Sequence, residues 1–298
     1  MRLGRRGVTI GVALVLLLAT SAGAGRSPIH RVRVNSRERQ ANGNSYGPVL
    51  SADGRFVVFR SRASNLVPGD GNRAQDVFVR DRRTGRTTRV SLAADGSEGN
   101  GDSGGAAISA DRRVVAFWSK ASNLIPDDRN DRSDIFVRDR SRATTTLVSI
   151  SSEGRHANAP GRAPALSANG RFVAFRSDAS NLVPDDTNDA WDVFVHDNRS
   201  GRTTRVSVGP GGSQGDGPSG EPWLSANGRF VAFASQAALT SRGARTDWNV
   251  LVHDRRTGLT TGVTIQRSSR RRPQQRSRTE RRRPLCRVLF LFVEPGRP

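Results

Sequence analysis

The chain has 298 residues, enough for one large or two ordinary domains with a sizeable hydrophobic core. Aromatic residues make up only 6% of it and there are 31 glycines, so the composition argues against a membrane bundle and favours a turn-rich fold. The formal net charge is +21, and the single cysteine, Cys286, excludes an internal disulfide bond. A large, regular, hydrogen-bonded architecture is therefore favoured over a small disulfide-linked one.

Residues 1–24 have the pattern of an export signal. Three arginines precede an apolar stretch from Val8 to Ala19, and Ala22-Gly23-Ala24 has the small-x-small form of a cleavage site. The apolar stretch is shorter than the roughly 20 residues that span a membrane comfortably. We therefore expect a cleaved signal, with no transmembrane span in the mature chain, and a periplasmic, cell-envelope or extracellular location. An uncleaved anchor is the alternative.

From residue 30 to residue 265 the chain repeats itself every 58 residues. The first block of the repeat is "LSADGRFVVF" (50–59), "ISADRRVVAF" (108–117), "LSANGRFVAF" (166–175) and "LSANGRFVAF" (224–233). The second is "DVFVRDR" (76–82), "DIFVRDR" (134–140), "DVFVHDN" (192–198) and "NVLVHDR" (249–255). The third is "TTRVSL" (87–92), "TTLVSI" (145–150), "TTRVSV" (203–208) and "TTGVTI" (260–265). A period of this length indicates a repeat architecture.

Each repeat offers four short strands. In three of the repeats the first two are joined at Asp-Gly or Asn-Gly, which predicts a type I′ hairpin turn. The second and third strands are apolar on both faces, so a sheet built from them needs neighbours on both sides. Radially stacked four-stranded blades provide such neighbours. The prediction is an all-β propeller over residues 25–265, with blades at about 48–92, 106–150, 164–208 and 222–265.

The "S-A-D/N-G-R-F-V-A-F" strand pair followed by "D-V-F-V-x-D" resembles the propeller repeats of TolB-like, WD-repeat-like exported bacterial proteins. The resemblance covers about residues 30–265. It implies a six-bladed ring in the full form and binding of a protein partner. For function it is a weak guide, because propellers also serve as gates on peptidases and occasionally as enzymes.

Ser103 lies in Gly-Asp-Ser-Gly-Gly, the run that surrounds the nucleophile of trypsin-like proteases. That chemistry also needs a histidine base and an orienting carboxylate. The only upstream histidine is His30, and no local sequence marks it as a base. Because the run occupies the place of a Gly/Asn/Ser/Pro-rich connection in the other repeats, we interpret Ser103 as a linker residue. No catalytic residue is predicted.

The loop before the third strand carries Asp-x-Asn-x-x-x-Asp in three repeats. The residues are Asp70, Asn72, Asp76; Asp128, Asn130, Asp134; and Asp186, Asn188, Asp192. Oxygen ligands at alternate positions of a tight loop suit Ca²⁺, the only cofactor that the sequence suggests. Asp and Asn also build turns without any metal, and both interpretations stay open. The fourth loop, 238–249, has lost the pattern.

The four tryptophans also allow two interpretations. Trp118, Trp191, Trp223 and Trp248 either form a ligand-facing surface or fill gaps between blades. Burial habits of tryptophan favour gap filling.

Residues 266–298 form an Arg-rich, low-complexity tail that resembles no propeller strand. It would bind anionic polymers without specificity, and no specific nucleic-acid partner is expected. A second hypothesis is that the tail is read out of frame. Shifted by one nucleotide, the codons of residues 284–287 can encode Leu-Ser-Ala, and those of residues 274–276 can encode Asn-Asn-Gly.

"HRVRVN" (30–35) looks like a fourth strand without the rest of its blade. Four recognisable blades in an incomplete ring are therefore expected, with self-association through open blade faces. The leading functional hypothesis is an exported, non-catalytic scaffold that binds a protein or another envelope macromolecule. The alternatives are a propeller enzyme or accessory domain of the lyase or peptidase class, and a calcium-stabilised structural protein.

Overall fold

A computed structural model of the chain describes residues 30–128, 130–240 and 248–263. All of them belong to the first of two compact units, Met1–Val263, while the second unit, Thr264–Pro298, lies outside the described residues. The described part consists of four antiparallel sheets of four strands each and one 3₁₀ turn, η1 (Pro210–Gly212). The predicted all-β repeat fold is confirmed, and we call the sheets blades 1 to 4 in chain order.

The four strands have the same lengths in every blade. Blade 1 comprises β1 (Ser45–Leu50), β2 (Phe56–Ser61), β3 (Asp76–Asp81) and β4 (Arg86–Arg89). Blade 2 comprises β5 (Ser103–Ile108), β6 (Val114–Ser119), β7 (Asp134–Asp139) and β8 (Thr144–Leu147). Blade 3 comprises β9 (Gly161–Leu166), β10 (Phe172–Ser177), β11 (Asp192–Asp197) and β12 (Arg202–Arg205). Blade 4 comprises β13 (Ser219–Leu224), β14 (Phe230–Ser235), β15 (Asn249–Asp254) and β16 (Leu259–Gly262).

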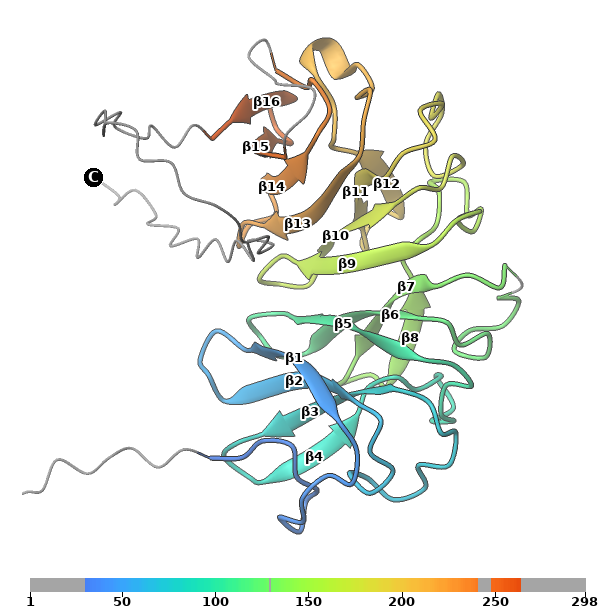
Figure 1. Ribbon diagram of the computed structural model, residues 1–298, viewed down its shortest axis with the longest axis vertical. Helices are drawn as coiled ribbons and strands as arrows, with labels where there is room; N and C mark the ends of the chain where they lie inside the picture. The colour runs from blue at the N-terminus through green and yellow to red at the C-terminus, as the bar shows by residue number, and fades with distance from the viewer. Residues whose placement is uncertain (1–29, 129, 241–247, 264–298) are drawn as a thin grey trace, which may run out of the picture. The chain divides into compact units, whose positions relative to one another are not determined.

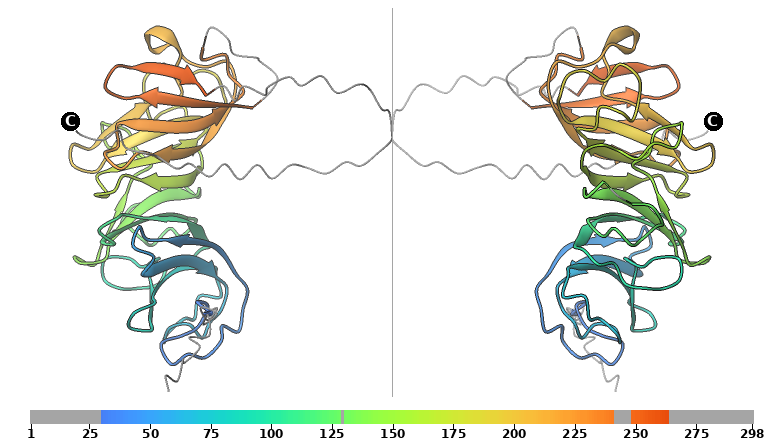
Figure 2. Two further views of the ribbon diagram at one scale, coloured as in Figure 1. Left: turned by 90° about the vertical axis from the view of Figure 1, so that its left-hand side faces the viewer. Right: turned by 90° about the vertical axis from the view of Figure 1, so that its right-hand side faces the viewer.

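Within each blade the strands pair in chain order, so every connection is a hairpin. The first strands of successive blades contact one another, β1 with β5, β5 with β9 and β9 with β13 (Figure 1). These inner strands therefore share the side on which the four blades converge. Among the described residues blade 4 does not pack against blade 1, so the ring of blades is open. The side views show the blades following one another in chain order (Figure 2).

The turn between the first two strands differs from the predicted type I′ turn. Gly54 has a φ of 66°, but Asp53 is not in the left-handed region. The Gly54 amide donates to the Ser51 carbonyl (2.8 Å), and the Asp53 carboxylate accepts from the Ser51 hydroxyl (2.6 Å). The prediction of the turn type was wrong because the aspartate acts through its side chain, which needs no positive φ.

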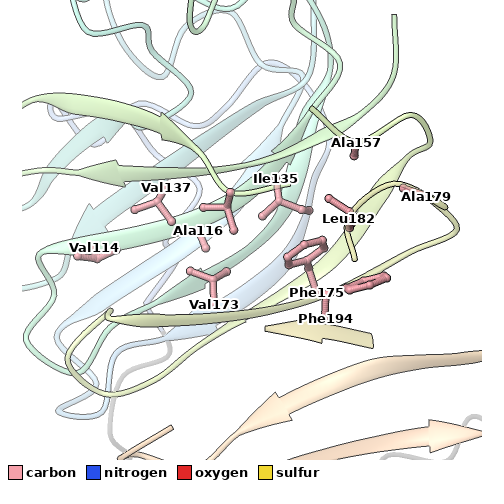
Figure 3. Packing of buried hydrophobic residues seen from close by; sticks show 11 residues of the cluster. Val114, Ala116, Ile135, Val137, Ala157, Val173, Phe175, Ala179, Leu182 and Phe194 are labelled. Carbon is pink, nitrogen blue, oxygen red and sulfur yellow. The ribbon is translucent and has the colours of Figure 1, made fainter. Parts of the chain in front are cut away.

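Neighbouring blades bury apolar side chains against one another. Figure 3 shows the cluster between blades 2 and 3, where Ile135 and Val137 of β7 meet Val173 and Phe175 of β10. Equivalent clusters join blades 1 and 2 and blades 3 and 4. The second and third strands are buried on both faces because each blade packs against the next, as the sequence predicts.

A polar contact recurs beside each cluster. Thr145 at the start of β8 donates to the carbonyl of Leu92 (about 2.5 Å), which follows the last strand of the preceding blade. Thr87 donates in the same way to Val34 (2.6 Å). Residues 30–35 thus occupy the place of the end of a preceding blade. The predicted strand is not formed there, because Val34 makes only an isolated bridge with Gln40.

Candidate functional site

Ser103 is the first residue of β5 and is fully buried. The prediction that it is a linker residue was therefore wrong. Its hydroxyl donates to the hydroxyl of Ser119 (2.8 Å). The equivalent pairs Ser45–Ser61 and Ser219–Ser235 lie at 2.9 and 2.8 Å. The serine holds the first strand to the second in three blades, which is a structural role that the repeat explains.

The acidic loop of blade 1 gathers its three predicted residues around an arginine. Asn72 donates to the Asp76 carboxylate (3.1 Å) and to the Gly99 carbonyl (2.8 Å). The guanidinium of Arg89 lies 3.9 Å from Asp70 and 3.4 Å from Asp76, and it also pairs with Glu98. Burial raises the pKa of Asp76 to about 6, and it raises the pKa of Asp70 as well.

Blade 3 repeats this arrangement. Arg205 lies 3.1 Å from Asp186 and 3.6 Å from Asp192, and all three side chains are less than a tenth exposed. Asn188 donates to Asp192 (3.3 Å), and Gln214 donates to Asp186 (2.7 Å). In these two loops the chain itself places a cation beside the buried carboxylates.

Blade 2 keeps the carboxylates but not the arginine. Leu147 occupies the position of Arg89 and Arg205 at the end of the fourth strand. Asn130 still donates to Asp134 (2.8 Å), and burial raises the pKa of both Asp128 and Asp134. No group of three or more His, Cys, Asp or Glu residues within the described ranges has metal-binding geometry, so amides, carbonyls or water would have to complete a calcium shell. The fourth loop falls partly on residues 241–247, outside those ranges.

Arginine and aromatic side chains gather where the inner strands begin. Arg60 lies over the Tyr46 ring (5.8 Å to the centroid), Arg162 over Trp118 (4.4 Å) and Arg176 over Trp191 (4.9 Å). We call these six residues the arginine–aromatic cluster. The Nε atoms of Arg60 and Arg176 are buried without a hydrogen-bond partner.

None of the four tryptophans lies in the fully buried core. Trp223 and Trp248 are 63% and 53% exposed, and Tyr46, the only tyrosine of the chain, is 50% exposed. Trp118 and Trp191 are half-buried beneath arginines. Gap filling is thus the wrong interpretation for Trp223, whereas Trp248 lies on a side of blade 4 that no described blade covers. The periodicity of the sequence does not predict the exposure of a tryptophan ring, because its burial depends on which blade lies beside it.

A groove of about 320 Å³ runs along the inner strands beside the cluster. It is lined mainly by small and apolar side chains, including Val49, Ile108, Leu166 and Trp223. Glu221 is the one ionisable residue in the described lining, and its carboxylate pairs with Arg176 (3.0 Å). The site therefore combines apolar surface with guanidinium groups. A partner with acidic groups along an apolar segment would complement it.

No protein-family model matches the chain, and the comparison with curated proteins finds no match either. Among solved structures, the chain is similar to TolB from Acinetobacter baumannii (16% identity, TM-score 0.45), with 74% of this chain and 44% of that one covered. It is also similar to a putative TolB from Agrobacterium tumefaciens (17% identity, TM-score 0.47), with 78% and 68% covered. A third similar structure is the tricorn protease (15% identity, TM-score 0.46), of which the chain covers 22%. The chain thus spans less than half of two of these three proteins.

Proposed function

We propose that the chain is an exported, non-catalytic propeller protein that binds a macromolecular partner at the arginine–aromatic cluster and the adjoining groove. The three arginines that stack on Tyr46, Trp118 and Trp191, of which Tyr46 is exposed, carry this proposal. Tryptophan, tyrosine and arginine are the residues that dominate binding energy at protein interfaces. The sequence resemblance to TolB-like repeats also implies protein binding.

The charge of the cluster selects the chemistry of the partner. Arg60, Arg162 and Arg176 present guanidinium groups beside an apolar groove, and in the part of the chain that the structure describes only Arg176 has an acidic partner there. Guanidinium groups bind carboxylates through paired charge-assisted hydrogen bonds. The partner is therefore an extended protein segment that alternates acidic and apolar residues.

Tryptophan fluorescence tests this proposal, because all four tryptophans lie at or near the inner strands or the open end of blade 4. A peptide of alternating Asp and Leu should shift the emission, and the affinity should fall as salt is added. R162A and R176A should weaken binding, whereas R83A, in an exposed turn, should not. An equal response to a peptide of alternating Lys and Leu, or an equal loss with R83A, would contradict the proposal.

Export rests on the pattern of residues 1–24, which lie outside the described residues. Among the described residues no helix is long and apolar enough to span a membrane. Expression in a bacterial host should give a mature protein that begins at Gly25, as read by mass spectrometry. A cytoplasmic product that retains residues 1–24 would contradict export.

Calcium stabilisation is a second candidate, and the loop of blade 2 favours it because Leu147 leaves Asp128 and Asp134 without the arginine of the other loops. A buried pair of carboxylates is stabilised by a bound cation. Calcium should raise the Tm of the natural chain and should raise it less in L147R. An unchanged Tm with calcium and with chelator would contradict this role.

An enzyme of the lyase or peptidase class remains the alternative to a binding protein. It requires a convergent group of acids, bases or histidines at the groove, and Glu221 alone does not provide one. Hydrolysis or elimination of a peptide or acidic sugar substrate, abolished by E221Q, would support the enzyme instead.

A further inference from the structure

Within residues 30–263, as far as the structure describes them, the fourth blade lacks the following neighbour that each earlier blade has. Val90, Val148 and Val206 follow the last strands of blades 1 to 3 and are at most 1% exposed, whereas the equivalent Val263 is 44% exposed. Trp248 stands at the position of Trp191 and is 53% exposed. The face of blade 4 that should meet a following blade is therefore open.

The chain itself indicates what covers this face. When the coding sequence is translated one nucleotide later, each shifted codon consists of the last two nucleotides of one original codon and the first nucleotide of the next. Only its middle nucleotide is then largely free, because that is the degenerate third nucleotide of the in-frame codon. Few residues are allowed at each shifted position, so a long match to the repeat is informative.

In this register the codons of residues 279–288 can encode Leu-Ser-Ala-Asp-Gly-Arg-Phe-Val-Ala-Phe. This is the sequence of residues 224–233 with Asp in place of Asn227, and the first repeat has Asp53 at that position. The longer match replaces the interpretation of codons 284–287 as Leu-Ser-Ala, which used the same shift at another alignment.

The match continues on both sides at one constant offset from the third repeat. Ser277 shifts to Pro, as at Pro164, and codons 294–296 shift to Asn-Leu-Val, as at residues 181–183. Each of these positions lies 113 residues after its counterpart in the third repeat, as does Thr279 after Leu166. Turn, strand and loop segments thus keep one common register.

We propose that the open face of blade 4 is the docking surface for a fifth blade of the same repeat, encoded one nucleotide out of register with residues 266–298. The side chains that a fifth blade would bring to this face match those that already pack between blades 3 and 4. Val231 and Phe233 of blade 4 pack against Val193, Val195 and Val206 of blade 3. The shifted codons of Cys286 and Val288 supply Val and Phe at the same two positions, opposite Val250, Val252 and Val263.

The nucleotide sequence tests the encoding directly. For the shifted register to encode this sequence, the in-frame codons must be ACT for Thr279, GAG for Glu280 and TGT for Cys286. The three arginines at positions 281–283 must be encoded by CGC, CGA (or AGA) and CGG. A stop codon in the shifted register before codon 296, or synonymous codons that shift to other residues at most of positions 279–288, overturns the proposal.

The docking itself is tested with a gene that is translated in the shifted register from codon 266 onward. This gene continues with the natural nucleotide sequence to the end of the fifth repeat, and we call its product the restored chain. The restored chain should melt several degrees higher than the present one and bind less of a dye for exposed apolar surface. V263D should lower the Tm of the restored chain by several degrees and that of the present chain little. Equal effects of V263D in both chains, or a present chain that dimerises and is dispersed by V263D, would show that a fifth blade does not cover this face.

Discussion

A positive φ at a non-glycine residue separates the first turn of blade 2 from the others. Arg112 has a φ of 65°, and the glycines at this position, Gly54, Gly170 and Gly228, have φ values of 66°, 69° and 71°. Left-handed backbone is unfavourable for a residue with a Cβ. The ion pair of Arg112 with Asp53 (3.1 Å) joins two well-exposed side chains and contributes little.

R112G should therefore stabilise the protein by about 0.5–1 kcal/mol, since relief of strain exceeds the added freedom of the unfolded chain. The reverse change, G170A, should destabilise it, because a Cβ there would lie 2.8 Å from the side chain of Val114. Urea unfolding measures both. A less stable R112G would show that the turn relaxes around arginine without strain.

The arginine of the first repeat block pairs with the aspartate that ends the third strand. Arg171 donates to Asp197 through Nε (2.9 Å) and Nη2 (2.7 Å), and this contact holds the pKa of the Asp197 carboxyl well below its usual range. Because the folded state then binds fewer protons than the unfolded state, stability is lost as the pH falls below about 4.

D197N should reduce the fall in Tm between about pH 5 and pH 3, because the group that titrates on unfolding is removed. D189N, in an exposed loop, is the matched control. Thermal unfolding across this pH range provides the comparison. An identical pH dependence of D197N and the natural chain would contradict the role of the pair.

At the scale of elements, the third strand and the loop before it depend on a buried cation in blades 1 and 3. R205L should cost about 3–5 kcal/mol, because it leaves Asp186 and Asp192 buried without their cation. The double variant D186N/R205L should recover part of this loss. Urea unfolding at pH 7 measures both changes, and a loss below about 1 kcal/mol for R205L would mean that water already screens the carboxylates.

The sequence predicts the elements better than their polar contacts. Apolar blocks with a 58-residue period identify the second and third strands, and these are the strands buried between blades. The arginines in the acidic loops were missed although "TTRV" carries them in two repeats and "TTLV" lacks them in another. Their role depends on a contact between the fourth strand and a loop, which no local pattern contains. The exposure of Trp248 was missed because the open face of blade 4 is a property of the assembled blades.

A propeller requires that its blades are related by one repeated rotation. Arg83, Ser141, Arg199 and Arg256 are exposed and occupy equivalent turns between the third and fourth strands. Spin labels on neighbouring pairs of these positions, in a chain with C286S, report the spacing of the blades.

Electron spin resonance distances are therefore the most direct measurement. In a propeller the distances 83–141, 141–199 and 199–256 should agree with one another, and the distance 83–199 should be longer than each of them. Unequal neighbour distances, or a distance 83–199 shorter than 83–141, would show that strands of different repeats interleave and that the blades do not exist.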